Sequence, residues 1–228
     1  WAGTPVHVLQ TSKDGAWVLA VLPYYFGWIK SQDIAYVDHK FKAAWKTGHY
    51  IVPIKDRFAV KDRSGLFHFY ARIGMLLPVK QTQRHSDLVY IPVSDSFHHA
   101  YMRSVRINKE NIAAFPWSAS YEHMADIINQ LVAKPYGWGG LYDYRDCSMT
   151  TMNYFSTFGI FLPRNSMSQL KSHVNIDLSN LNFSEKYNYL RHHAKAFASL
   201  VGHNGHVMLY LGTHHDQAIV FSALWGLS

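Results

Sequence analysis

Short hydrophobic runs, separated by turn-forming residues, fill the first 106 residues of the chain. Turns rich in Asp, Ser and Gly, such as residues 12–15 and 62–65, divide these runs. Runs this short, with many β-branched and aromatic residues, are typical of small antiparallel barrels. The pattern predicts strands over 6–9, 16–22, 27–29 and 34–37 and then over 50–54, 58–61, 66–73, 88–92 and 105–107. We therefore expect two small all-β barrels in tandem.

The pattern changes after Phe115, where hydrophobic residues recur at helical spacing over 124–131, behind Ser118 or Ser120 as N-cap. A second helix is predicted to begin at Cys147 and to end at Gly159. The later part of the chain predicts a short helix over 185–193 and strands over 197–201, 206–211 and 218–224, with an Asn-Gly hairpin turn at 204–205. Helices followed by an antiparallel meander indicate an α+β domain. We place the domain boundaries at 1–38, 39–108 and 109–228.

Composition narrows the class of protein. The chain has 228 residues, of which 48% are hydrophobic and 15% aromatic, and this excludes a disordered chain. The longest apolar runs, 15–29 and 147–163, are broken by Gly, Pro, Asn or hydroxyl residues, so we expect no membrane span. The chain starts at Trp1 rather than at Met, without a signal sequence, and we expect a processed or trimmed product.

The net positive charge of the chain lies entirely in the first half. Residues 1–106 hold 14 Lys and Arg against 7 Asp and Glu, whereas residues 107–228 hold 8 of each sign. Such an asymmetry favours an anionic partner for the first half, and a generic basic surface is the alternative. There is no long Lys/Arg run of the kind that marks a nucleic-acid-binding arm, so we expect no nucleic-acid partner.

Cys147, the single cysteine, is the most prominent candidate for chemistry. It follows Asp146 at a predicted helix N-terminus, where the helix dipole and unpaired N–H groups favour a thiolate and an oxyanion. His206 begins a predicted strand and could serve as its base. A buried packing role is the alternative for a lone cysteine. The chain has several pairs of adjacent His residues, but the side chains of adjacent residues point apart on helices and strands, and there is no Cys cluster. We therefore expect neither a metal site nor a cofactor.

Four motifs appear in order in the second half: Pro135 to Gly140 (PYGWGG), Asp146-Cys147-Ser148, Leu162 to Ser166 (LPRNS) with Gln169, and Gly205 to Gly212 (GHVMLYLG). Over residues 109–228 this closely resembles the NlpC-type, papain-like cysteine peptidases of bacterial cell walls. The segment Gly27-Trp28-Ile29-Lys30, followed by Asp33-Ile34-Ala35, resembles bacterial SH3 domains. The resemblance implies two SH3-like barrels before an α+β papain-like catalytic domain.

The resemblance also implies roles for individual residues. Cys147 becomes the nucleophile, His206 its general base, and Tyr136 a neighbour of the thiol that helps to bind or polarise the substrate. Asp146 and Ser148 match positions that help to recognise the amino end of a short wall peptide, with helix capping as the alternative. Arg164 matches the family's Leu-Pro-Arg segment, and a purely structural role is open for it.

The third catalytic residue departs from the family's usual pattern. A polar side chain, often His, stands there in relatives, and the position aligns with Ser222. If Tyr210 pairs with Ala218 in the hairpin, Ser222 lies opposite His206 on the same face. His214 or His215, folding back, is the alternative. We also expect a further strand after Ser228, so that either residues are missing or the site differs.

The function implied is hydrolysis of an amide in the peptidoglycan stem peptide, between D-glutamate and the following diamino acid, by an exported enzyme. The basic first half would bind the anionic wall. Two alternatives remain open at this point: a wall-binding protein with a decayed catalytic site, and a related Cys–His acyl or amide transferase.

Overall fold

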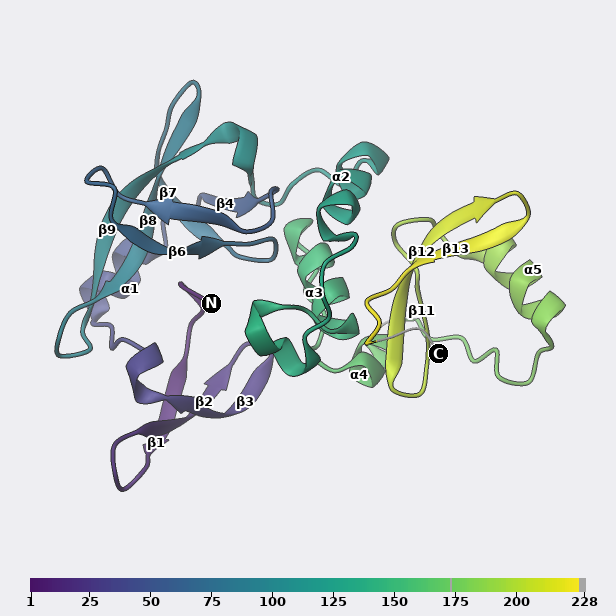
Figure 1. The fold of residues 1–228 in the computed structure, drawn as a ribbon, viewed down its shortest axis with the longest axis horizontal. Helices are drawn as coiled ribbons and strands as arrows, with labels where there is room; N and C mark the ends of the chain where they lie inside the picture. Colours follow the sequence, from purple (N-terminus) through teal and green to yellow (C-terminus); the bar gives the residue numbers. More distant parts are fainter. Residues whose placement is uncertain (173, 226–228) are drawn as a thin grey trace. The chain divides into compact units, whose positions relative to one another are not determined.

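The computed structural model describes residues 1–172 and 174–225. It divides into two compact units, residues 1–117 and 118–228, the first rich in strands and the second mixed (Figure 1). The prediction of a β-rich first half followed by an α+β half is confirmed. In the described part of the chain, no helix has the length and apolar character needed to cross a membrane.

The first unit opens with an antiparallel three-stranded sheet of order β1-β2-β3. Its strands are β1 (His7–Thr11), β2 (Trp17–Leu22) and β3 (Tyr25–Lys30), followed by the 3₁₀ turn η1 (Ser31–Asp33). Along β2, Val18 and Ala20 are fully buried and alternate with exposed Trp17 and Val21, as a half-buried strand requires. The predicted strand over 34–37 is reduced to a single bridge between Tyr36 and His99.

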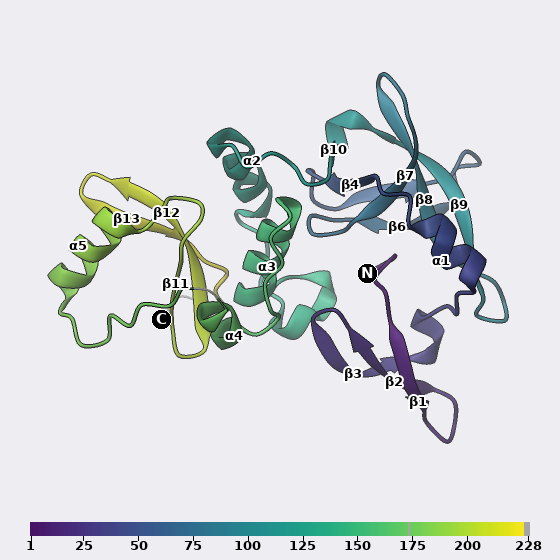
Figure 2. The same cartoon turned by 180° about the vertical axis from the view of Figure 1, so that it is seen from behind.

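The rest of the first unit is a second β-rich body. Its five-stranded sheet has the order β10-β4-β7-β8-β9, and β5 and β6 form a separate ribbon. Its elements are α1 (His39–Trp45), β4 (Tyr50–Pro53), β5 (Phe58–Lys61), β6 (Phe67–Ala71), β7 (Leu77–Thr82), β8 (Ser86–Ser94), β9 (Ala100–Asn108), η2 (Lys109–Asn111) and β10 (Ile112–Ala114). Fully or almost fully buried Ile51, Leu77, Val89, Ile91 and Val105 lie at the centre of its core. Because β10 pairs with β4, this sheet continues past residue 108 (Figure 2).

The second unit places helices before a three-stranded sheet of order β11-β12-β13. Its elements are α2 (Tyr121–Leu131), η3 (Trp138–Asp143), α3 (Cys147–Thr157), α4 (Ser166–Lys171), α5 (Phe183–His193), β11 (Leu200–His203), β12 (His206–His214) and β13 (Gln217–Phe221). Ser120 caps α2 by accepting a hydrogen bond from the His123 N–H, as expected. Helix α3 ends two residues before Gly159, which takes a positive φ of 81°.

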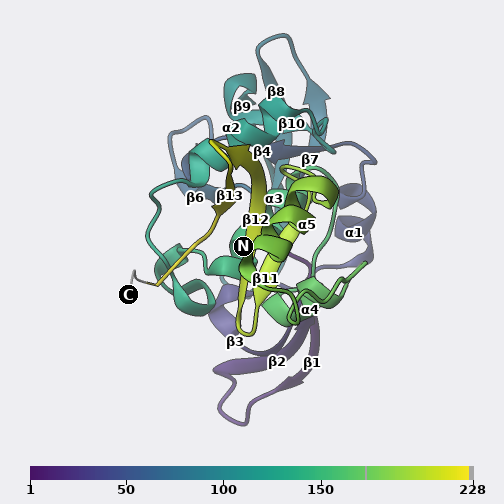
Figure 3. The ribbon, with the colours of Figure 1, turned by 90° about the vertical axis from the view of Figure 1, so that its right-hand side faces the viewer.

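The central helix α3 is buried along almost its whole length. It packs against β12, and the short helix α4 packs against α3, β11 and β12, while α5 lies beside β13 (Figure 3). Leu209 and Val207 of β12 and Tyr154 of α3 are at most 1% exposed at this junction. The packing therefore brings together the helix that begins at Cys147 and the strand that begins at His206.

Candidate active site

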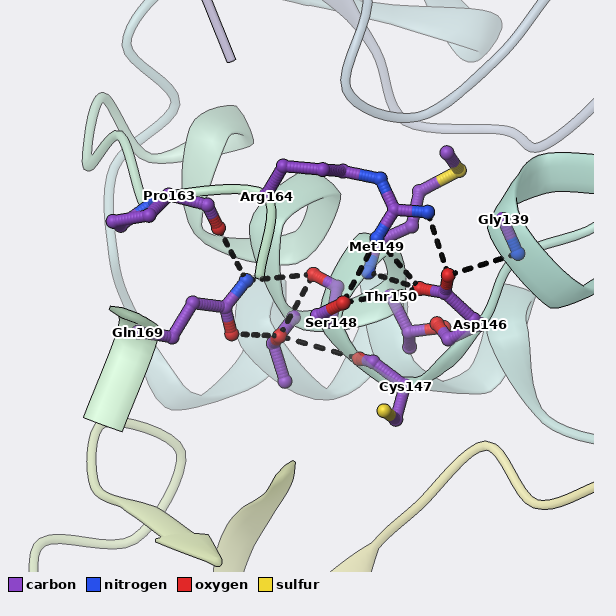
Figure 4. Close-up of polar contacts among 10 residues, drawn as sticks. Gly139, Asp146, Cys147, Ser148, Met149, Thr150, Pro163, Arg164 and Gln169 are labelled. Carbon is purple, nitrogen blue, oxygen red and sulfur yellow. Dashed lines mark hydrogen bonds and ion pairs between the residues drawn. The ribbon is translucent and has the colours of Figure 1, made fainter. Parts of the chain in front are cut away.

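Asp146 and Cys147 form the start of α3. The Asp146 side chain caps the helix, because its Oδ1 accepts the Met149 N–H at 2.8 Å. Cys147 is the first helical residue. The residue is 6% exposed, and its thiol is not in a disulfide. The positive end of the helix dipole thus lies at the thiol, as the sequence predicts. Figure 4 shows the Cys147 side chain on the side of the helix away from Arg164.

Arg164 binds the side chains of the two residues that flank the cysteine, Asp146 and Ser148. Its guanidinium donates to both carboxylate oxygens of Asp146, at 2.9 and 2.5 Å, and to the Ser148 hydroxyl at 2.8 Å (Figure 4). Burial by itself would raise the pKa of Asp146, but the hydrogen bonds and charge of Arg164 hold it below the usual value. Gly139, at a positive φ of 65°, donates its N–H to the same carboxylate at 3.2 Å. Asp146 is therefore an ionised, fully engaged group.

Gln169 links three segments around the start of α3 by hydrogen bonds. It is 2% exposed, and its Nε2 donates to the Ser148 and Pro163 carbonyl oxygens at 2.8 and 2.7 Å. Its Oε1 accepts the Thr151 hydroxyl at 2.6 Å. A buried amide with its donors and its acceptor engaged fixes the surrounding backbone firmly. Gln169 therefore ties α4 and the Pro163 segment to the first turn of α3.

Tyr136 lies beside the thiol. Its pKa is raised, first by burial and then by the neighbouring Cys147 side chain and the Asp146 carboxylate. The charge of Arg164 and a hydrogen bond from the Cys147 backbone N–H act in the opposite direction. Its ring also meets the ring of Trp225 edge-on, with centroids 5.8 Å apart. Tyr136 therefore connects the start of α3 to the segment that follows β13.

His206 is bonded to Ser222. Its Nε2 lies 2.6 Å from the Ser222 Oγ, so the predicted contact is present. The register predicted for the hairpin is wrong: Tyr210 pairs with Val220, not with Ala218, and the pairing shifts by one residue between Tyr210 and Gly212. Strand β13 ends before Ser222, whose side chain reaches His206 from the loop that follows the strand.

The surroundings of His206 favour its neutral form. Burial is the first cause that lowers its pKa, and the positive charge of His203 is the second. His214 and His215, the alternative third residues, are exposed at the other end of β12, where their rings meet edge-on with centroids 4.0 Å apart. They do not occupy the place that Ser222 holds.

This arrangement offers a thiol at a helix N-terminus, a partly buried imidazole fixed through one nitrogen, and a tyrosine hydroxyl. These are the groups that nucleophilic attack on a carbonyl requires. No group of three His, Cys, Asp or Glu side chains that could hold a metal ion occurs over residues 1–172 and 174–225.

Comparison with known families agrees with this geometry. Residues 133–219, which begin before η3, end within β13 and include Cys147 and His206, match the model of the NlpC/P60 family. Residues 1–30 match an SH3 domain of SH3b1 type, and residues 38–84 match an SH3 domain of SH3b2 type. The chain carries an NlpC/P60 domain behind two SH3b-type domains.

Solved structures of two NlpC/P60 proteins resemble the whole chain. One is an NlpC/P60 endopeptidase from Photobacterium damselae subsp. piscicida, with 28% identity and a TM-score of 0.83 over 99% of this chain and 52% of that one. The other, an NlpC/P60 family protein from Bacillus cereus, has 18% identity and a TM-score of 0.66 over 97% of this chain and 75% of that one. This chain thus spans about half the length of the first structure. Among curated proteins, none matches it significantly.

The NlpC/P60 domain contains two residues whose importance sequence reasoning underestimates. Arg164 and Gln169 stand in the quoted motifs, yet nothing in their spacing reveals that one engages Asp146 and the other engages Thr151. The signal that could have found them is chemical. A buried Asp at a helix start needs a cationic partner, and the Arg of the Leu-Pro-Arg motif is one of the residues that could supply it.

Proposed function

We propose that the NlpC/P60 domain hydrolyses an amide bond of the peptidoglycan stem peptide through a Cys147 thioester. The observation that carries this proposal is the 2.6 Å contact between His206 Nε2 and Ser222 Oγ. It occupies Nε2 and leaves the other ring nitrogen, Nδ1, as the one that we propose exchanges a proton with the thiol. A serine in third position can therefore serve the same orienting purpose as a larger polar group.

The chemistry then follows in two halves. The Cys147 thiolate attacks the amide carbonyl, and the first N–H groups of α3 and the Tyr136 hydroxyl stabilise the oxyanion. The His206 imidazolium donates its proton to the leaving amine, and the C–N bond breaks to leave a thioester. In the second half, His206 takes a proton from water, the hydroxide attacks the thioester, and a carboxylate and the free thiol are released.

We further propose that the bond lies between D-glutamate and the following diamino acid, and that Asp146 and Ser148 act on the amino end of the peptide. Arg164 already donates hydrogen bonds to both side chains. A substrate amine would therefore bind to Asp146 and Ser148 in addition to Arg164, without replacing it. This bond and these roles follow from the resemblance to relatives and from the position of both side chains next to Cys147.

The experiment is digestion of a defined uncrosslinked muropeptide by the full chain, with product masses measured by chromatography and mass spectrometry. We expect release of the diamino acid end and a new carboxylate on D-glutamate. Protein alkylated with iodoacetamide is the matched control. Substrate left intact by the unmodified protein, although iodoacetamide labels its Cys147 rapidly, overturns the proposal. A thiol that is not labelled near neutral pH favours the wall-binding alternative.

Ser222 provides a sharper prediction about the same site. In Ser222→Ala the imidazole of His206 loses its partner at Nε2. We expect kcat to fall roughly tenfold, which is less than the rate enhancement of a whole general base because the imidazole itself remains. KM should stay near the wild-type value, because Ser222 reaches His206 rather than the substrate. Ser222→Thr keeps the hydroxyl and should retain most of kcat. Equal kcat values for Ser222→Ala and wild type would contradict the orienting role.

We further propose that the protein is exported, which follows from the resemblance to relatives, and that its basic first half attaches it to the anionic cell wall. Its excess of seven positive charges suits polyanionic polymers, whose attraction weakens as salt screens it. Sedimentation of the full chain with isolated wall material should therefore decrease between low and high salt. Binding that does not change with salt contradicts this part of the proposal.

A further inference from the structure

His203 lies directly across the β11–β12 hairpin from His206. The two residues are cross-strand partners on either side of the Asn204-Gly205 turn, and Gly205 takes a φ of 83°. Their ring centroids are 5.6 Å apart. His203 itself is exposed, whereas His206 is partly buried. One imidazole of this pair therefore remains in contact with solvent while the other belongs to the catalytic site.

The backbone fixes this juxtaposition. A Cβ added at Gly202 would lie 2.6 Å from the His206 carbonyl oxygen and 2.7 Å from the Leu170 side chain, so β11 approaches β12 and α4 as closely as it can. The ring of His203 is oriented as well, because its Nδ1 lies 3.1 Å from the Asn204 carbonyl oxygen, which can only accept.

Other ionisable groups on the elements around β12 do not have this position. Strand β13 has no ionisable side chain, α3 has Cys147 and Tyr154 behind the Asp146 cap, and α4 has Lys171. Among the described residues, His203 is the charged group that lowers the pKa of His206, after burial. A cation at this distance destabilises a second cation on His206.

We propose that His203 is a positioning residue for catalysis that keeps the Cys147–His206 pair active at acidic pH. This inference rests on the proposed function. A positive charge on His203 opposes protonation of His206. The acid side of the pH profile is thereby moved to lower pH. Two unit charges about 5.6 Å apart in an aqueous setting shift each other's titration by roughly half a pH unit.

The test compares kcat/KM for a muropeptide from pH 4 to pH 8, on the order of ten points, in the full chain and its variants. For His203→Gln, which removes the charge and keeps a polar side chain, we expect the acid limb to move up by roughly 0.5 pH unit. His203→Lys keeps a cation and should hold the limb at or below its wild-type position. His214→Gln removes a histidine eight positions further along β12 and should leave the profile unchanged.

An NMR titration of the His206 ring in wild type and His203→Gln gives a readout that does not depend on turnover. The His206 ring should titrate at higher pH in His203→Gln than in wild type. An unchanged titration and acid limb, or a loss of activity that is equal at every pH, overturns the inference. If wild type cleaves no muropeptide at any pH, the proposed function fails, and the NMR titration alone then decides whether His203 acts on His206.

Discussion

Replacing Cys147 with alanine is expected to abolish muropeptide cleavage, with a loss of at least about 10⁴-fold in kcat/KM. The thiol is the atom that forms the bond to the substrate carbonyl, and in the described part of the chain no second cysteine could replace it. The fold should persist, because the side chain removed is small and the capping bond from Asp146 to the Met149 N–H does not involve it.

Cys147→Ser is the matched variant for this prediction. It preserves size but replaces a thiol with a hydroxyl, which is ionised far less readily, so activity should fall to nearly the same level. Thermal unfolding and circular dichroism check that both variants remain folded. Cleavage by either variant at a rate comparable with wild type would show that the thiol is not the nucleophile.

Replacing Arg164 with alanine is expected to lower the free energy of unfolding by about 3 kcal/mol at neutral pH. The substitution leaves the Asp146 carboxylate, with 12% of its side chain exposed, without its cation. The folded-state pKa of Asp146 is depressed, so the stabilisation is present above the ordinary aspartate pKa near 4 and is lost as pH falls below it. The difference between variant and wild type should therefore shrink from pH 6 toward about pH 3.

The chain offers a control for this measurement in Arg191. Its ion pair with Asp216 spans 3.4 Å, with side chains 51% and 85% exposed, and exposed pairs contribute little. Chemical denaturation of Arg191→Ala should give a free energy of unfolding close to that of wild type. If Arg164→Ala and Arg191→Ala are equally stable at neutral pH, the ion pair at Asp146 does not support the start of α3.

Local signals predict the start of α3 well. Asp146 before Cys147, with Gly159 after the helix, is sufficient because caps act on neighbouring N–H and C=O groups. The helix α1 is not predicted, although Asp38 caps it and Phe41 stacks on Trp45, because seven residues with three cationic or His side chains give a weak periodic pattern. Strand β7 is missed for a related reason: Pro78 within the run argues against a strand.

Long-range pairing is harder to derive from the sequence. The contact between His206 and Ser222 is present, but the register used to predict it is off by two residues, since Tyr210 pairs with Val220. Alternation of side chains shows which residues share a face but does not fix which residues of two strands are paired, and it carries no signal for the one-residue shift near Gly212. The partnership of Arg164 with Asp146 joins residues 18 positions apart and depends on how α4 packs. The domain boundaries at 38 and 108 and the catalytic roles remain predictions.

The most direct test of the central claim is turnover of a defined uncrosslinked muropeptide in the presence of hydroxylamine. A thioester on Cys147 partitions between water and this nucleophile, so wild type should release the diamino acid end together with the free acid and the hydroxamate of D-glutamate. Both products should be absent with Cys147→Ala. Intact substrate with wild type, or equal cleavage by wild type and Cys147→Ala, would contradict the account.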